Sequence, residues 1–344
     1  GLVVETGPDL RTVTLTATFT FSVTERDSGR LWFTFPPVDR PDQLARITLD
    51  GASLAAADLG VAAAEGGARF LLPASLSARP GPHQLVVTGA WPSEPRVDFT
   101  HWGSWHPYLG SRANPVPITI EVRTDTAFQV VSSGTLVADT TNGSRRVARW
   151  RTTVPQGWVF LSVGRYRQAD LVEQATRLVV LWPADHEAFS SDLVSREPFR
   201  VLAFLRNAFG PPTTDRVTLI EIPGDSVNNF AVDGLVAISR GSYRRIEQSG
   251  TYLSAMLAHE LAHLWWGDLV NPVGPGARWL TEGFAEYSRY LYERATGGES
   301  LAWSYRNLVM VRQFAGREPP PLAGNPAEGE DEAIYYQKGA FVLR

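Results

Sequence analysis

The feature of this sequence that most constrains its fold is a change in hydrophobic periodicity near residue 168. Before that point apolar and polar residues alternate, most clearly over residues 13–22, where Val, Leu, Ala and Phe alternate with Thr and Ser. A period of two is typical of a β-strand with one buried face. From Thr251 onward the apolar residues recur with helical spacing instead. We therefore expect two domains, residues 1–167 and residues 168–344.

Short runs of apolar and β-branched residues predict further strands in the first domain. They cover residues 31–35, 84–88, 118–123, 147–152 and 159–163. Turn residues separate these runs, as in Pro80-Gly81-Pro82. Many short strands with such joints predict an antiparallel sandwich or an open, saddle-shaped sheet.

The second domain is expected to mix strands and helices. Buried strands are predicted at residues 178–182 and 217–222, with a helix at 198–209 between them that ends at Gly210. Residues 317–332, rich in proline, glycine and acidic side chains, are expected to form a loop.

Composition excludes several classes of function. A formal net charge of −4 argues against nucleic acid as a partner. With no cysteine, the chain has no disulfide and no thiol nucleophile. No apolar run reaches the roughly 18 residues that a membrane-spanning helix needs. The chain begins with Gly1 and stops at Arg344 inside a predicted helix, so we expect it to be part of a longer protein.

The segment Ala258-His259-Glu260-Leu261-Ala262-His263 carries the strongest chemical signal. On a helix, His-Glu-x-x-His places two imidazoles one turn apart on the same face, a spacing that suits tetrahedral zinc. Glu260 lies next to that face and can take a proton from a water on the metal. The surrounding helix is apolar on almost every side, so we expect it to be buried. The alternative is a pair of hydrogen-bonded core histidines.

A third ligand is needed, and Glu282 is the strongest candidate. It lies eighteen residues beyond His263, in a second predicted helix that starts at Gly276 or at Thr281. The residues alone leave a second interpretation open, in which Glu282 is a charge placed favourably near a helix N-terminus.

This pattern resembles the gluzincin metallopeptidases of the aminopeptidase N and leukotriene hydrolase family. The resemblance extends to Trp279-Leu280 with Glu282-Gly283-Phe284-Ala285, and to Tyr336-Gln337-Lys338-Gly339-Ala340 near the end of the chain. It covers most of residues 168–344, and residues 1–167 only weakly. It implies an α+β protein in which an N-terminal antiparallel β-sandwich or saddle domain precedes a thermolysin-like catalytic domain.

The resemblance also implies roles for individual residues. His259, His263 and Glu282 would bind one zinc ion, and Glu260 would be the general base on the zinc-bound water. Tyr336 would donate a hydrogen bond to the oxyanion, although the neighbouring Tyr335 is the alternative. The implied function is zinc-dependent peptide-bond hydrolysis, with a peptide or protein as substrate.

Two residues near the predicted site are open to two interpretations each. Glu286, one turn beyond Glu282, either pairs with Arg289 or accepts a hydrogen bond from a ligand histidine. Asp268 is another candidate for supporting a ligand.

The sequence departs from the family pattern at the stretch that holds the substrate's amino group. Ala231 stands where the family has glutamate, and alanine cannot pair with an ammonium group. The strand around Ala231 is still expected to bind substrate backbone, while Asp233, Asp225 or Glu221 are candidates for the missing anchor.

Two further departures concern the end of the chain and one aromatic segment. The family's C-terminal helical domain has no counterpart before Arg344, so the cleft is expected to be more open. Residues 99–108 gather two histidines and several aromatic side chains, and we interpret them as a packed loop at the domain interface rather than a ligand site.

Three functions follow from these observations. The first is an aminopeptidase with a different amine anchor. The second is a zinc endopeptidase or oligopeptidase with an open cleft. The third is a non-catalytic peptide-binding module that keeps the zinc, which Glu260 and Tyr336 argue against because binding alone needs neither.

Overall fold

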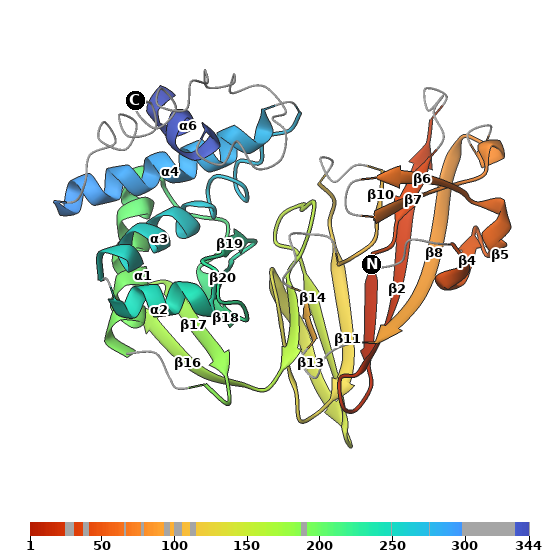
Figure 1. The fold of residues 1–344 in the computed structure, drawn as a ribbon, viewed down its shortest axis with the longest axis horizontal. Coiled ribbons are helices and arrows are strands. Elements are labelled where there is room, and N and C mark those ends of the chain that lie inside the picture. Colours follow the sequence, from red (N-terminus) through yellow and green to blue (C-terminus); the bar gives the residue numbers. More distant parts are fainter. Residues whose placement is uncertain are drawn as a thin grey trace. The chain divides into compact units, whose positions relative to one another are not determined.

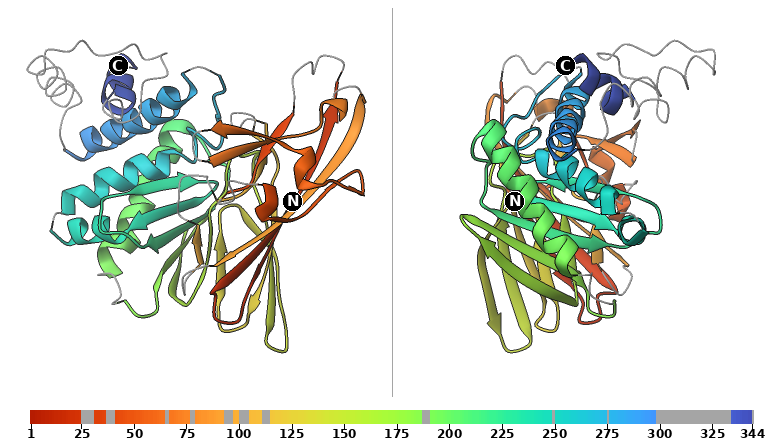
Figure 2. Two further views of the ribbon diagram at one scale, coloured as in Figure 1. Left: turned by 45° about the vertical axis from the view of Figure 1, so that its right-hand side comes forward. Right: turned by 90° about the vertical axis from the view of Figure 1, so that its left-hand side faces the viewer.

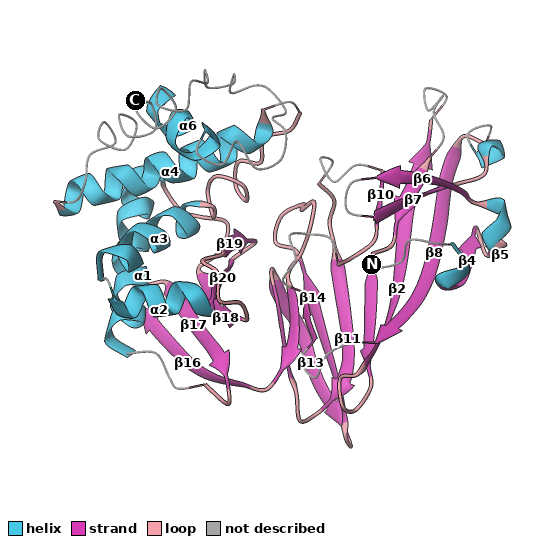
Figure 3. Ribbon diagram, in the orientation of Figure 1, coloured by secondary structure: helices cyan, strands magenta, loops and turns pink. Residues whose placement is uncertain are grey.

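The computed structural model describes residues 1–24, 31–36, 41–64, 67–76, 79–92, 97–99, 105–110, 115–186, 191–248, 250–274, 276–297 and 334–343. The chain divides into two compact units, Gly1–Arg165 and Tyr166–Arg344. Figure 1 shows both, and Figure 3 shows that strands dominate the first unit whereas the helices longer than one turn lie in the second. The expected loop at residues 317–332 lies outside the described residues.

The first unit contains a large sheet and two smaller ones. The large sheet has the order β13 (Thr135–Asn142), β14 (Arg145–Arg151), β11 (Thr119–Asp125), β1 (Leu2–Thr6), β2 (Thr12–Val23), β8 (Gly81–Pro92), β4 (Leu44–Leu49) and β5 (Ala52–Ser53). A second sheet has the order β10 (Tyr108–Leu109), β3 (Trp32–Thr34), β7 (Gly67–Leu71) and β6 (Gly60–Ala64). The third consists of β12 (Gln129–Ser132), β15 (Leu161–Gly164) and β9 (Val97–Phe99).

The predicted alternation places one face of β2 in the core of this unit. Val13, Leu15 and Ala17 are fully buried, while the threonines between them are partly exposed. The predicted strands are all present, and the strands pair antiparallel with one exception: β1 and β11 run parallel. Parallel pairing joins segments far apart in the chain, so alternation within either strand could not reveal it.

The second unit contains a mixed sheet. Its order is β16 (Tyr166–Glu173), β17 (Thr176–Pro183), β18 (Arg216–Ile222), β20 (Leu235–Ser239) and β19 (Asn229–Val232). The three inner strands are parallel, and the two edge strands pair antiparallel with their neighbours. Alternate side chains of β17, β18 and β20 pack against α1 (Ser191–Phe209) and α3 (Gly250–Ala262) in one hydrophobic core.

The remaining helical segments are α2 (Arg240–Gln248), α4 (Ala277–Thr296), a π-helical turn η4 (Ile334–Lys338) and α6 (Gly339–Val342). Helix α1 begins at Ser191 rather than at the predicted Pro198, so Pro198 lies inside the helix, a position where proline is disfavoured and that the local pattern did not predict. It ends, as predicted, before Gly210, which adopts a φ of 84°. Among the described helices, none is both long and apolar enough to cross a membrane.

Helices α3 and α4 position the His-Glu-x-x-His segment and Glu282, and Figure 2 shows the two helices side by side in both views. As predicted, α3 is buried: Leu253, Leu257 and Leu261 are at most 1% exposed. Helix α4 starts after Gly276, whose φ of 85° sets the turn into the helix. Of the two expected starts, Gly276 is therefore correct, and Glu282 lies in the second turn of the helix.

Candidate metal centre

His259 and His263 lie at the carboxyl end of α3, where the helix tightens and stops. His259 belongs to the helix, while His263 is the first residue beyond it and its backbone N–H donates to the Glu260 carbonyl. The two Nε2 atoms are 3.3 Å apart. The predicted one-turn spacing thus brings both imidazoles to one point.

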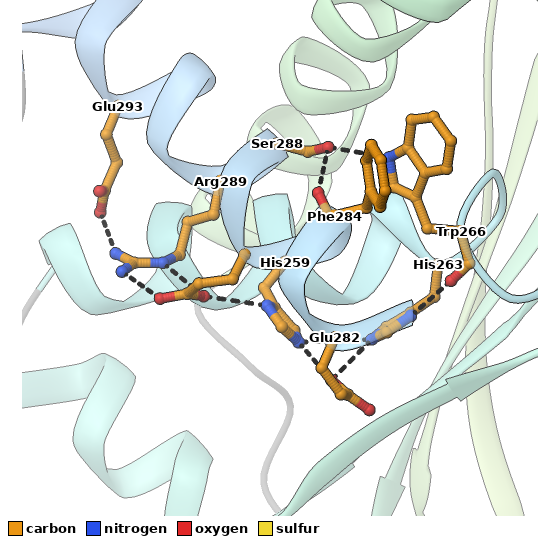
Figure 4. Close-up of polar contacts among 9 residues, drawn as sticks. His259, His263, Trp266, Glu282, Phe284, Ser288, Arg289 and Glu293 are labelled. Carbon is orange, nitrogen blue, oxygen red and sulfur yellow. Dashed lines mark hydrogen bonds and ion pairs between the residues drawn. The ribbon is translucent and has the colours of Figure 1, made fainter. Parts of the chain in front are cut away.

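Glu282 reaches the same point from α4. Its Oε2 atom lies 3.4 Å from His259 Nε2 and 3.6 Å from His263 Nε2 (Figure 4). Within the described part of the chain, these three residues form a group whose donor atoms could hold a metal ion, and their side chains are only 10%, 11% and 14% exposed.

The triangle of donor atoms fits zinc. In a tetrahedral site with zinc–ligand distances of about 2.0–2.1 Å, neighbouring donor atoms are about 3.3–3.4 Å apart. The sides of the triangle are 3.3, 3.4 and 3.6 Å. Two imidazoles and one carboxylate with a fourth position left open are also the donor set of catalytic zinc sites. Glu282 Oε2 is buried and lies close to both Nε2 atoms, so a cation among the three atoms would satisfy it.

Both imidazoles are fixed through their Nδ1 atoms. His259 Nδ1 donates to Glu286 Oε2 at 3.0 Å, and His263 Nδ1 donates to the carbonyl oxygen of Trp266 at 2.9 Å. Because a carboxylate and a carbonyl only accept hydrogen bonds, Nδ1 carries the proton and Nε2 is free to bind a metal.

Trp266 is itself held by α4. Its indole N–H donates to Ser288 Oγ at 2.9 Å, and Ser288 Oγ donates in turn to the Phe284 carbonyl at 2.7 Å. The Trp266 and Phe284 rings lie 4.6 Å apart, and Figure 4 shows this contact beside His263. Helix α4 therefore supports both histidines in addition to supplying Glu282.

The charges of the cluster shift the pKa values of its members. Burial alone would raise the pKa of the Glu282 carboxyl, but His263 and His259 outweigh it and hold that pKa far below its usual value. Burial by itself lowers the pKa of His259, but hydrogen bonds to Glu282 and Glu286 outweigh it and raise the pKa to about 10. In the metal-free protein the imidazoles therefore hold a proton whose positive charge offsets the negative charge of the carboxylates.

Glu260 and Tyr336 border this triangle. Glu260 is 7% exposed, and burial raises the pKa of its carboxyl. The Tyr336 ring stacks on the His259 ring with centroids 5.2 Å apart. Burial, the Glu282 charge and a hydrogen bond to Glu282 raise the pKa of the Tyr336 hydroxyl above its usual value. A carboxyl group and a protonated phenol hydroxyl therefore lie near the donor atoms.

The neighbouring residues with open interpretations now have defined contacts. Tyr335 is buried with its ring under the Arg278 guanidinium, 5.3 Å away. Glu286 makes both contacts that the sequence presented as alternatives, one to His259 and one to Arg289. Asp268 accepts a hydrogen bond from the backbone N–H of Asp233 at 3.0 Å.

Ala231 and the three acidic residues considered as a substitute amine anchor lie in different segments and have different partners. Ala231 is in edge strand β19, and Asp233 is 1% exposed in the turn that follows it, with a φ of 43°. Glu221 is buried and bonded to His186 at 2.7 Å and Arg240 at 3.2 Å. Asp225 is exposed and paired with Arg244.

The aromatic segment at residues 99–108 is described only in part. Trp105 is 6% exposed and its indole N–H donates to the Val159 carbonyl. His106 is 2% exposed and its Nδ1 donates to the Pro107 carbonyl. These two side chains are packed inside the first unit, and His101 and Trp102 lie outside the described residues.

Comparison with known proteins finds a family model that matches the part of the chain carrying this arrangement. Residues 238–344 match the peptidase family M1 domain. Aminopeptidase N of Mus musculus is 28% identical over 156 residues, which is 39% of this chain and 15% of that protein. Aminopeptidase M1 of Arabidopsis thaliana is 24% identical over 282 residues, 76% of this chain and 31% of that protein. The matched segments thus span less than a third of these curated relatives.

Solved structures show the same fold. An M1 zinc metallopeptidase from Deinococcus radiodurans superposes with a TM-score of 0.72 over 99% of this chain and 79% of its own, at 18% identity. A variant of that enzyme bound to a Tyr-Ser-Ala substrate superposes with a TM-score of 0.69. The predicted architecture, a β-rich domain followed by a helical catalytic domain, is confirmed by this likeness.

Proposed function

We propose that this chain, whose residues 238–344 carry a peptidase family M1 domain, is a zinc-dependent metallopeptidase of the aminopeptidase N type. The observation that carries the proposal is the triangle formed by His259 Nε2, His263 Nε2 and Glu282 Oε2, with sides that suit tetrahedral zinc. These three residues would hold the ion. When bound, zinc would polarise the scissile carbonyl and make a water molecule easier to deprotonate.

Glu260 is proposed as the general base and then the general acid. Its carboxylate takes a proton from the attacking water and later delivers that proton to the departing amine nitrogen. The burial that raises the pKa of Glu260 supports this exchange, because a higher pKa makes the carboxylate a stronger base toward the attacking water. The resulting carboxylic acid is still more acidic than an ammonium group, so it can pass the proton to the departing amine.

Tyr336 is proposed to stabilise the oxygen that gains negative charge during attack. Its hydroxyl lies beside Glu282 and stays protonated, so it can donate a hydrogen bond to a carbonyl oxygen in the same place. Stacking on His259 holds the ring in position.

Edge strand β19 is proposed to bind the substrate backbone through Ala231. Asn229 Nδ2 donates to the Tyr252 hydroxyl at the start of α3, and Asp233 N–H donates to Asp268 beyond His263. One end of the strand is therefore held by α3 and the turn after its other end by the segment that follows His263. Among the described strands, β19 pairs only with β20, so an extended peptide can add along its other edge.

The charges near β19 favour cleavage of peptides without a free amino terminus as a second candidate function. Ala231 carries no charge, Glu221 is already bonded to His186 and Arg240, and Asp233 is 1% exposed. None of these three offers an accessible carboxylate to an ammonium group. Hydrolysis of matched free-amine and N-acetylated peptides separates an aminopeptidase from an endopeptidase.

The central test combines metal content with hydrolysis. Glu282→Gln is expected to lose zinc, whereas Glu260→Gln is expected to keep zinc and lose turnover. Glu173→Gln, which removes a carboxylate from an exposed position on β16, is the matched control. If zinc-loaded wild type and Glu260→Gln were equally inactive across a broad peptide panel, the chain would be a binding module rather than an enzyme.

A further inference from the structure

One face of α4 carries a row of charged side chains that begins at the metal centre. Glu282, Glu286, Arg289 and Glu293 are spaced by four, three and four residues, which places them along one stripe of the helix. Glu282 and Glu286 reach the two nitrogens of the same imidazole, His259. The face of α4 that supplies the candidate ligand Glu282 therefore also supplies Glu286, the hydrogen-bond partner of the candidate ligand His259.

Arg289 holds both oxygens of Glu286. Its Nη2 donates to Oε1 at 2.6 Å and its Nε donates to Oε2 at 3.0 Å, the two-pronged geometry that a guanidinium makes with a carboxylate. Oε2 is also the atom that accepts from His259 Nδ1 at 3.0 Å. The imidazole and the guanidinium therefore share one carboxylate oxygen, and the rotation of that carboxylate is fixed.

Arg289 is fixed in turn. Its Nη1 donates to Glu293 Oε1 at 2.8 Å, and its guanidinium lies 4.2 Å from the centre of the Tyr290 ring. The Arg289 side chain is 19% exposed and that of Glu286 is 10% exposed. Figure 4 shows the sequence of contacts from Glu293 through Arg289 to His259.

We propose that Arg289 is a positioning residue for the metal centre: by gripping both oxygens of Glu286, it fixes the His259 imidazole with Nε2 aimed at the point shared with His263 and Glu282. This inference rests on the proposed zinc site. Arg289 touches neither the donor triangle nor a substrate in this arrangement, and it acts through Glu286.

An ordinary ion pair on a helix surface would respond differently to replacement of arginine by lysine. An i, i+3 ion pair on a helix surface contributes little to stability, and a lysine serves it as well as an arginine. Here Glu286 is buried, and the contact to His259 uses an oxygen that Arg289 also holds. A lysine can meet one oxygen at a time, so it would restore the charge but not the fixed orientation.

The test measures metal binding rather than turnover. Arg289→Met is expected to weaken zinc binding about 10- to 100-fold, the range found when an outer partner of a ligand histidine is removed. Arg289→Lys should fall between Arg289→Met and wild type. Arg294→Met removes an exposed arginine five residues further along the same helix and should leave the affinity unchanged. Zinc affinity is measured by competition with a chromophoric chelator, and the cobalt-substituted proteins are compared by their visible absorption.

A double-mutant cycle shows whether Arg289 acts through Glu286. The double variant Glu286→Gln with Arg289→Met should bind zinc as Glu286→Gln alone does. Once the Glu286 carboxylate is gone, Arg289 has no carboxylate through which to act on His259, so its removal has no further effect. The double variant also avoids an unpaired buried carboxylate, so it remains informative if Arg289→Met folds poorly.

Two results would overturn the inference. They are an Arg289→Met affinity equal to wild type with an unchanged cobalt spectrum, and an Arg289→Lys affinity equal to wild type. Failure of the wild type itself to bind zinc, or binding that survives Glu282→Gln, would instead contradict the proposed function. The two failures are therefore distinguishable.

Discussion

Replacing Tyr336 by phenylalanine removes one hydroxyl and leaves the rest of the centre in place. The ring stacks on His259 with centroids 5.2 Å apart, and phenylalanine keeps that contact. Zinc affinity should therefore change little. The hydroxyl is the proposed donor to the developing negative charge, and losing one such donor costs about 2.7–4 kcal/mol, or roughly 10²- to 10³-fold in kcat.

The assay compares kcat and KM for one cleaved peptide in zinc-loaded wild type, Tyr336→Phe and Tyr335→Phe. Tyr335 is the matched control, because it is adjacent and buried but its ring faces Arg278 rather than His259. We expect kcat to fall for Tyr336→Phe with KM nearly unchanged, and Tyr335→Phe to resemble wild type. A Tyr336→Phe enzyme with kcat within threefold of wild type, or an equal loss in Tyr335→Phe, would refute the reasoning.

Three further predictions concern protons and packing. Zinc binding at pH 7 should release about one proton, because the carboxylates around His259 raise its metal-free pKa to about 10; calorimetry in buffers of different ionisation heat measures this, and proton-free binding would contradict it. In the first unit, the Arg79 carbonyl and Asp50 raise the pKa of His83, so their contribution to stability is complete below about pH 6.5 and is lost as the pH rises through the folded value. His83→Ala should therefore lower the melting temperature more at pH 6 than at pH 9, and an equal loss at both would exclude this linkage. Gly283→Ala should weaken both zinc binding and turnover, since a Cβ there would lie 3.1 Å from the Gly339 backbone. Unchanged zinc binding and turnover in this variant would mean that α4 and α6 separate easily at this contact.

The sequence predicted best what depends on neighbouring residues. His259, Glu260 and His263 share one helical turn, so their spacing alone places them together. The strands of the first unit were predicted for the same reason, since alternation is a local pattern. The predicted start of α1 was wrong because the helix continues on the N-terminal side of Pro198, although proline is disfavoured inside a helix.

What the sequence left open depends on how α3 and α4 pack. Whether Glu282 approaches the histidines follows from contacts between the two helices, and the residues alone do not encode a distance between them. Glu286 is a second case in which the sequence alone could not predict a contact between the two helices. Its pairing with Arg289 is local and its contact with His259 is not, so the two appeared as alternatives although a carboxylate has two oxygens and makes both contacts.

The row of side chains on α4 determines where this chain tolerates extra residues. An insertion between Glu282 and Glu286 rotates everything beyond it by about 100° and would carry the supporting carboxylate and Arg289 away from His259 together. An insertion beside Val273, which is 67% exposed and precedes the helix, leaves the register of the row intact. Length variation among descendants of this chain should therefore accumulate before Gly276 and be absent from the first four turns of α4.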